Sequence, residues 1–335
     1  MIAATTALLT YGEAPSSKVQ MHVLLTGVQT DPLALVALGV EIATIGLYLF
    51  GVRRLTRRGR HWSAVSTTNF VAGIVIIWLA VGSGLAAYDD VNVVAHVVQH
   101  ILLMMVAPPL LVTGKPITLA TQAAGRRNQV RILKVVHSRV LALLTFPVLT
   151  WFLYYGVMYA FFLNHQLYDY AVNHVLFHDA THLIFLAVGY LYWQPLIGLD
   201  PTRWRLSHPI RILTTFVGMP FEAFLGIAVA MSTTPIDPIN TLANTKAAGN
   251  IFWILAMAVT GPCIAVMAFR WYRQIQRQTP REDRFAVASA EESSVRAAQL
   301  GVEASREGWT IPPWRLAQLE AQAARKARQA TGPES

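Results

Sequence analysis

Residues 91–113 read VNVVAHVVQHILLMMVAPPLLVT, a run of 23 residues without a single Lys, Arg, Asp or Glu. A helix of this length crosses a hydrocarbon core about 30 Å thick. The chain has seven such apolar runs, at about 31–52, 65–87, 91–113, 140–162, 172–197, 210–231 and 249–270. Within lipid each run must be helical, because only a helix satisfies its backbone N–H and C=O groups within its own segment. The sequence therefore predicts an all-α, polytopic membrane helix bundle with seven transmembrane helices over residues 31–270.

The composition separates this chain from soluble proteins. Of its 335 residues, 54% are hydrophobic and 13% are charged, and the mean hydropathy is +0.42. A soluble domain carries about 25% charged residues. The net charge of +9 would suit a protein that binds nucleic acid, but the basic residues lie in alternate loops between the apolar runs. We therefore expect a lipid bilayer around the protein and no nucleic acid as a partner.

The distribution of Lys and Arg predicts the orientation of the helices. The loops after the first, third and fifth runs, together with the C-terminal tail, hold 25 of the 27 basic residues. Because cytoplasmic loops are enriched in Lys and Arg, we expect the N-terminus outside and the C-terminus in the cytoplasm. Residues 1–30 then form an extracytoplasmic segment that lacks the basic start of a cleaved signal peptide. Residues 271–335 form a charged cytoplasmic tail, in which WRLAQLEAQAARKARQA (314–330) predicts a short helix.

Histidines occur at helical spacing in two of the apolar runs, as His96, His100, His174, His178 and His182. A separation of four residues keeps side chains on one helix face and advances about 6 Å along the axis. Both runs cross in the same direction, so all five histidines are expected at one depth near the outer surface. Polar side chains within a bilayer are costly and mark functional sites, which favours a metal or haem site over a purely structural polar cluster. His174 and His182 are about 12 Å apart along the axis, so we expect two adjacent sites, or one site with an accessory ligand.

The ligand type alone does not identify the metal, because neutral imidazole suits Zn, Cu, Fe and Ni. Met104 continues the histidine face of the third run, and Met158 and Met231 end two other runs on the outer side. Thioethers favour Cu(I), although methionine is also an ordinary packing residue. Asp179 could orient an imidazole or be a solvated carboxylate at a helix end. Cys263 is the single cysteine, so the chain has no CxxC metal site and no disulfide framework.

Other polar groups and prolines also lie within the runs. Glu41 and Glu222 are near the middle of the first and sixth runs. Each could be a hydrogen-bonded, protonated carboxyl or could take part in the passage of protons or metal. Pro108 and Pro109 remove backbone donors from the third helix and predict a kink. The remaining histidines, which we do not expect to be ligands, are His22, His61, His137, His165 and His208.

Two longer motifs contain the spaced histidines. The third run and its exit include HVVQH (96–100) and APPLLVTGKP (107–116), and the fifth includes HVLFHDATH (174–182) and WQPLIGLDP (193–201). With the seven runs, these motifs make the chain similar, over about 65–270, to the CtaG-type cytochrome c oxidase assembly factors of bacteria. The resemblance implies a multi-pass protein of the bacterial cell membrane that binds copper through the five spaced histidines. It also implies cytochrome c oxidase subunits as partners, and an assembly role without turnover of its own.

Two alternatives remain open on spacing alone. A seven-span zinc-dependent membrane hydrolase would use a metal-bound water to attack a lipid amide or ester, and no outer residue clearly supplies its general base. A haem-b electron-transfer protein would use histidines from two helices as axial ligands. Visible absorption and metal analysis distinguish haem, zinc and copper.

Overall fold

The structure, a computed structural model, describes residues 23–24, 27–89, 91–236, 239–299 and 313–330. Those residues are predominantly helical, with one isolated bridge between Val28 and Ser83 and no extended strand among them. The predicted all-α class is therefore confirmed. The chain divides into two compact units, Met1–Ala268 and Phe269–Ser335.

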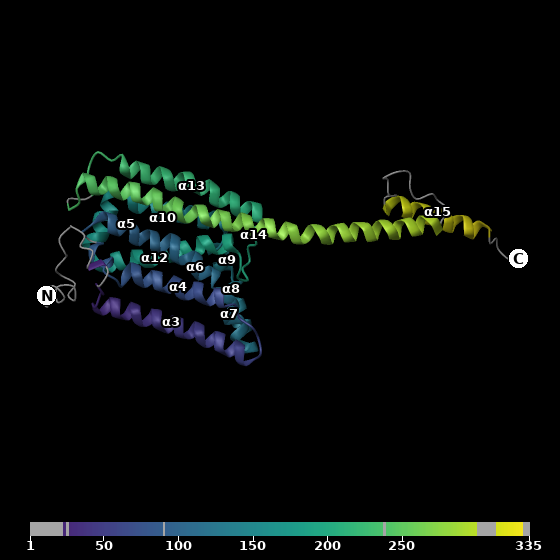
Figure 1. Ribbon diagram of the computed structural model, residues 1–335, viewed down its shortest axis with the longest axis horizontal. Coiled ribbons are helices and arrows are strands. Elements are labelled where there is room, and N and C mark those ends of the chain that lie inside the picture. The colour runs from purple at the N-terminus through teal and green to yellow at the C-terminus, as the bar shows by residue number, and fades with distance from the viewer. Residues whose placement is uncertain (1–22, 25–26, 90, 237–238, 300–312, 331–335) are drawn as a thin grey trace. The chain divides into compact units, whose positions relative to one another are not determined.

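The helices follow the apolar runs with short helices between them (Figure 1). In order they are α3 Pro32–Arg57, α4 Ala64–Val81, η1 Ala86–Tyr88, α5 Val93–Ile101, η2 Leu102–Val106, α6 Ala107–Thr113, α7 Pro116–Ala123, α8 Arg126–Val136, α9 Arg139–Leu144, α10 Pro147–Leu163, α11 His165–Asn173, α12 Val175–Ile197, α13 His208–Ala230, α14 Leu242–Gln299 and α15 Pro313–Ala330. Helix α15 coincides with the short helix predicted in the tail, whereas α14 continues past residue 270, where the last apolar run was expected to end.

Six of the described helical segments are long and apolar enough to cross a membrane, so the protein is a multi-pass membrane protein. They are Pro32–Arg57, Ala64–Val81, Val93–Ala123, Leu176–Ile197, His208–Ala230 and Leu242–Gln278. The predicted fourth run, 140–162, is divided between α9 and α10. Pro147 restricts Phe146 to an extended conformation (φ −66°, ψ 121°), which interrupts the helix. Helix α10 has 17 residues and is about 26 Å long, so the count of seven spans and the orientation stay predictions.

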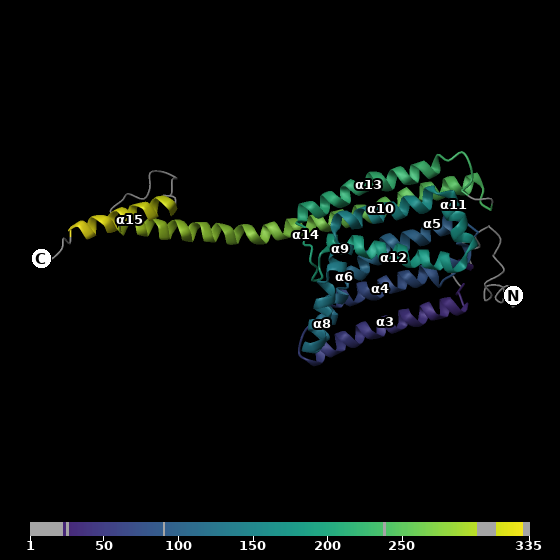
Figure 2. The ribbon, with the colours of Figure 1, turned by 180° about the vertical axis from the view of Figure 1, so that it is seen from behind.

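The third run forms the centre of the bundle and is held between α4 and α12. Its membrane segment is 67% buried, compared with 11% for α3. Figures 1 and 2 show α3 at one edge and α13 at the opposite edge, with α7 and α8 at one end and α11 at the other. This arrangement follows from composition, since the central segment carries buried polar side chains while α3 presents large apolar ones outward.

The proline pair of the third run is accommodated by a π-helical turn, η2. Its end is marked by the Ala107 N–H, which donates to the Leu102 carbonyl five residues earlier. Pro108 and Pro109 have no N–H, so the Met104 carbonyl has neither an α-helical nor a π-helical donor. A Cβ atom added at Gly189 of α12 would lie 2.5 Å from that carbonyl oxygen. Glycine is therefore required for the close approach of α12 to η2.

Candidate metal centre

Four of the predicted histidines meet between α5 and α12. The ring centroids of His96 and His100 on α5 are 4.2 Å apart, and those of His178 and His182 on α12 are 4.6 Å apart. Across the helix pair, His96 stacks on His178 at 5.3 Å with 7° between the ring planes, and His100 faces His182 edge-on at 5.9 Å. All four side chains are buried. The i, i+4 spacing on two neighbouring helices thus produces one compact group, here called the histidine cluster.

The cluster contains two overlapping sets of three possible ligands. One set is His96, His100 and His178; the other is Asp89, His178 and His182. Within each set the donor atoms lie within 4.8 Å of one another. A small change of side-chain rotamers would bring these atoms to bonding distance around one ion. Because His178 belongs to both sets, the two sets are adjacent.

The ring nitrogens of the cluster fit a metal ion. Both nitrogens of His100, Nδ1 of His96 and Nε2 of His182 are buried and have no hydrogen-bond partner among the described residues. Buried polar atoms are normally hydrogen-bonded, and an unsatisfied one costs about 1–3 kcal/mol. A bound cation would supply the missing partner to these lone pairs.

Aromatic rings from three helices enclose the cluster. His100 lies 4.0 Å from the ring of Phe185 on α12 and 5.9 Å from Phe162 on α10, measured between centroids. Tyr168 of α11 meets His96 edge-on at 5.0 Å. These aromatic walls limit the access of water to the imidazoles, and a low local dielectric strengthens electrostatic interactions.

The structure does not bring His174 to the cluster, and His174 belongs to neither of the two ligand sets among the described residues. Helix α12 begins at Val175, and His174 is its N-cap with extended backbone angles (φ −130°, ψ 94°). The four-residue spacing therefore no longer keeps His174 on the face of His178. Instead His174 is exposed, its Nδ1 lies 2.9 Å from the Tyr170 carbonyl oxygen, and its ring stacks on Tyr170 at 3.9 Å.

Asp89 is a candidate ligand that the sequence analysis missed. It lies between η1 and α5, outside any helix, so helical spacing does not relate it to the histidines. Gln99, which stands between the two histidines of α5 in sequence, donates from Nε2 to Asp89 Oδ2 at 2.8 Å and to the Ala80 carbonyl at 3.0 Å. A ligand oriented by a buried amide is typical of metal sites. The polar Gln99 within an apolar run is the one signal that could have indicated this role.

The methionines and Asp179 have other surroundings. Met104 and Met158 are buried in the main hydrophobic core, where packing explains them. Met231 is 75% exposed at the end of α13. Asp179 is half-buried and lines a groove together with His182.

That groove reaches the cluster from the side of the bundle. It has a volume of about 740 Å³ and runs between α3, α4 and α12. Its walls are mostly apolar, but Asp89, Asp179 and His182 lie along it, as does the buried Glu41 of α3. The groove is therefore a mostly apolar approach, with a few polar side chains, to one edge of an otherwise closed cluster.

Glu222 is hydrogen-bonded within the bundle. Its Oε2 accepts from the Thr260 hydroxyl at 3.0 Å and its Oε1 from the Tyr155 hydroxyl at 3.4 Å. These bonds favour the structural interpretation of Glu222 over a role in passage.

The other histidines lie outside the two ligand sets. The Nδ1 atom of His137 lies 2.9 Å from the Leu133 carbonyl oxygen, and that of His165 lies 2.9 Å from the carbonyl of Ile236. His61 and His208 belong to neither set among the described residues, and His22 lies outside those residues.

Comparison with known proteins identifies the family. The family of cytochrome c oxidase caa3 assembly factors (Caa3_CtaG) matches residues 46–274. Uncharacterised proteins of Mycobacterium tuberculosis and Mycobacterium bovis are each 32% identical over 268 residues, covering 75% of this chain and 40% of the relative. A Mycobacterium leprae protein is 32% identical over 269 residues, with 74% and 40% covered.

The chain spans about 40% of the length of these curated relatives. No solved structure matches it. The family match covers more than half of the chain and includes the whole histidine cluster. The chain therefore belongs to the cytochrome c oxidase caa3 assembly factor family.

Proposed function

We propose that this protein binds copper in the histidine cluster and supplies it to cytochrome c oxidase during assembly, without a catalytic turnover of its own. The observation that carries the proposal is the set of four buried imidazoles, several of whose ring nitrogens have no partner among the described residues. Family membership supports the recipient, cytochrome c oxidase. Copper is the cargo in this proposal, and the protein holds it until transfer.

The ligand chemistry favours copper among the metals that imidazole binds. Divalent copper has the highest affinity for nitrogen ligands in the first-row series. A donor protein must also release its metal, and three neutral imidazoles without a thiolate hold copper less firmly than a cysteine site does. Cys263, the single thiol, belongs to neither ligand set.

The overlap of the two sets provides a way to move the ion. Asp89 and His182 line the groove, whereas His96 and His100 lie deeper, and His178 is common to both sets. An ion arriving through the groove would first meet Asp89 and His182. It would then pass inward as His96 and His100 replace them, with His178 bound throughout. Release to a partner would follow the same exchange in reverse.

The predicted orientation places this process on the outer side of the membrane. The cluster is in the first turns of two helices that are expected to begin at the outer surface. Copper could then be received and passed on without crossing the cytoplasm. The oxidase subunit that accepts it would approach the groove side, where His182 is reached.

A zinc-dependent hydrolase is the second candidate, and Asp89 is the observation that favours it. Two histidines and one carboxylate with an open position form a known type of catalytic zinc site. Asp89 as a ligand, however, leaves the site without an assigned general base. Haem is disfavoured, because the rings of Phe185 and the neighbouring histidines fill the space around His100.

The test is copper loading of the oxidase in cells that lack this protein. Oxidase polypeptides should still be made, but the purified complex should be deficient in copper and in activity. Wild-type protein should restore both, and the double variant His100→Ala, His178→Ala should not. His174→Ala is the matched control, since His174 is on the same chain segment but outside the cluster. Restoration by the double variant at equal membrane abundance would reject the copper role.

A further inference from the structure

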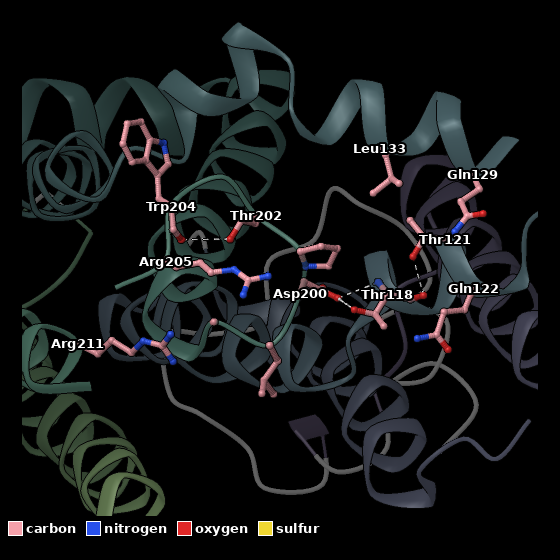
Figure 3. Close-up of a pocket in the computed structure, with 13 residues that line it drawn as sticks. Thr118, Thr121, Gln122, Gln129, Leu133, Asp200, Thr202, Trp204, Arg205 and Arg211 are labelled. Atoms are coloured by element: carbon pink, nitrogen blue, oxygen red, sulfur yellow. Dashed lines mark hydrogen bonds between the residues drawn. The ribbon is translucent and has the colours of Figure 1, made fainter. Parts of the chain in front are cut away.

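A second pocket, with a more polar lining, lies at the end of the bundle formed by α7 and α8, opposite the end where α11 covers the histidine cluster (Figures 1, 2 and 3). It has a volume of about 510 Å³. The side chains of Thr118 and Thr121 from α7 and Gln129 from α8 line one side. The loop between α12 and α13 lines the other side and contributes Asp200 and Arg205. None of these residues belongs to the histidine cluster or lines the groove beside it.

Asp200 provides an unfilled acceptor in this pocket. The residue is 5% exposed, and its Oδ1 accepts hydrogen bonds from the Thr118 N–H at 2.8 Å and the Thr118 hydroxyl at 2.6 Å (Figure 3). Its Oδ2 is buried and has no partner among the described residues. Burial raises the pKa of Asp200. A ligand with an N–H or O–H donor would satisfy the second oxygen.

Two arginines contribute positive charge to the lining of the same pocket. Arg211 donates from Nε to the Leu206 carbonyl at 2.9 Å and from Nη1 to the Ile197 carbonyl at 3.2 Å, so its guanidinium is held in place. Arg205 is exposed and extends from the loop toward the pocket centre (Figure 3). Within the described part of the chain Arg205 has no ion pair or hydrogen bond. Guanidinium groups with neighbouring hydroxyls are the usual donors to phosphate.

The neighbouring helix α8 presents both apolar and basic side chains outward. Its Val130 and Val135 side chains are 60% and 61% exposed. Basic side chains of the same helix, Arg127 and Arg131 among them, are exposed as well. Basic side chains beside the end of a membrane segment are attracted to anionic lipid headgroups. The pocket is also immediately beyond Ile197, where a membrane segment ends, so it is at the level of lipid headgroups.

We propose that this pocket binds a phospholipid headgroup that carries a hydrogen-bond donor, with the phosphate at Arg205 and Arg211 and the donor at Asp200 Oδ2. The ammonium of phosphatidylethanolamine and the hydroxyls of phosphatidylglycerol both meet this requirement. Phosphatidylcholine has the same phosphate but no N–H or O–H. The lipid would fix α7 and α8 against the loop after α12 and so stabilise this end of the bundle.

The test is lipid retention by the purified full-length protein, measured by native mass spectrometry after exchange into detergent with one defined lipid. Lipids with identical acyl chains and ethanolamine, glycerol or choline headgroups are compared. We expect the protein to retain the ethanolamine and glycerol lipids well above the choline lipid. Arg205→Gln should lower that retention roughly three- to tenfold, because one partly exposed charge-assisted contact is lost. Arg203→Gln is the matched control, since Arg203 is exposed in the same loop and does not line the pocket.

Further arms separate the possible failures. Asp200→Asn replaces the free acceptor by an amide, and it should abolish the preference for ethanolamine over choline; its melting temperature shows whether it folds. Equal retention of phosphatidylcholine by the wild type would overturn the assignment of Asp200. If Arg203→Gln lowers lipid retention as much as Arg205→Gln does, the effect comes from general surface charge and the pocket assignment is wrong. Displacement of the lipid by excess inorganic phosphate, with equal thermal protection, would make the pocket a free-phosphate site instead.

Discussion

Replacing His100 by leucine should change the stability of the metal-free protein and its metal affinity in opposite directions. His100 is 2% exposed, and neither of its ring nitrogens has a hydrogen-bond partner among the described residues. An ordinary core residue is replaced at a cost in stability. A side chain retained for metal binding instead destabilises the metal-free fold, because its polar atoms are buried without partners.

The magnitude follows from those two nitrogens. An unsatisfied buried donor or acceptor costs about 1–3 kcal/mol, and a replacement of similar volume costs less than about 1.5 kcal/mol in packing. For two unsatisfied nitrogens the cost is about 2–6 kcal/mol. After a packing loss of up to about 1.5 kcal/mol, the metal-free His100→Leu variant should therefore be more stable by at least about 0.5 kcal/mol. In a protein of this size, each kcal/mol of added stability raises the melting temperature by about 2–4 °C. Copper affinity should fall by more than about 100-fold, since even the loss of a residue that only orients a ligand costs 10–100-fold.

The assay is thermal unfolding of purified protein with a chelator and with copper. Copper at 100 times its dissociation constant stabilises the folded wild type by about 2.7 kcal/mol, whereas the variant should gain little. His174→Leu is the control: His174 is exposed and outside the cluster, so this change should leave the copper-induced shift intact. If metal-free His100→Leu is less stable than the wild type, the His100 nitrogens are satisfied in the folded protein and the argument for a site prepared for metal fails.

Three further predictions concern the rest of the molecule. Gly189→Ala should destabilise the bundle by about 1–3 kcal/mol, because the new Cβ would lie 2.5 Å from the Met104 carbonyl oxygen. The control is Gly156→Ala, where nothing lies within 4 Å of the new Cβ, and thermal unfolding should show it to be neutral or stabilising. If both variants lose the same stability, the close-approach argument is refuted. Removal of residues 285–335 should leave copper binding unchanged in a titration, and a loss of binding would assign the tail a role in the site. A reporter fused within residues 120–135 should give a cytoplasmic signal, and an external signal would reverse the proposed orientation.

Much of the histidine cluster could be predicted from sequence because it depends on helical periodicity. His96 and His100 remain four residues apart within one continuous helix, and so do His178 and His182. The spacing therefore specifies the face on which each pair lies. The packing of α5 beside α12, which brings the two pairs together, was expected from matching depth and is observed in the ring distances.

The remaining features depend on contacts between residues distant in sequence, or on local breaks in a helix. His174 has the expected spacing, but the helix begins one residue later, and no strong breaker marks that boundary. Asp89 reaches the cluster from a loop, where no periodicity applies. The π-helical turn before Pro108 could be anticipated only as an unspecified kink. In each case tertiary packing selects among conformations that the local sequence permits.

The most direct test of the copper proposal is X-ray absorption spectroscopy of the purified protein loaded with copper. The proposed site predicts a first shell of imidazole nitrogen, with the outer-shell scattering typical of histidine rings. In the variant with His96, His100, His178 and His182 all changed to alanine, bound copper should be lost while the protein still inserts in the membrane. A first shell dominated by sulfur, or an unchanged copper spectrum in the four-histidine variant, would contradict the proposal.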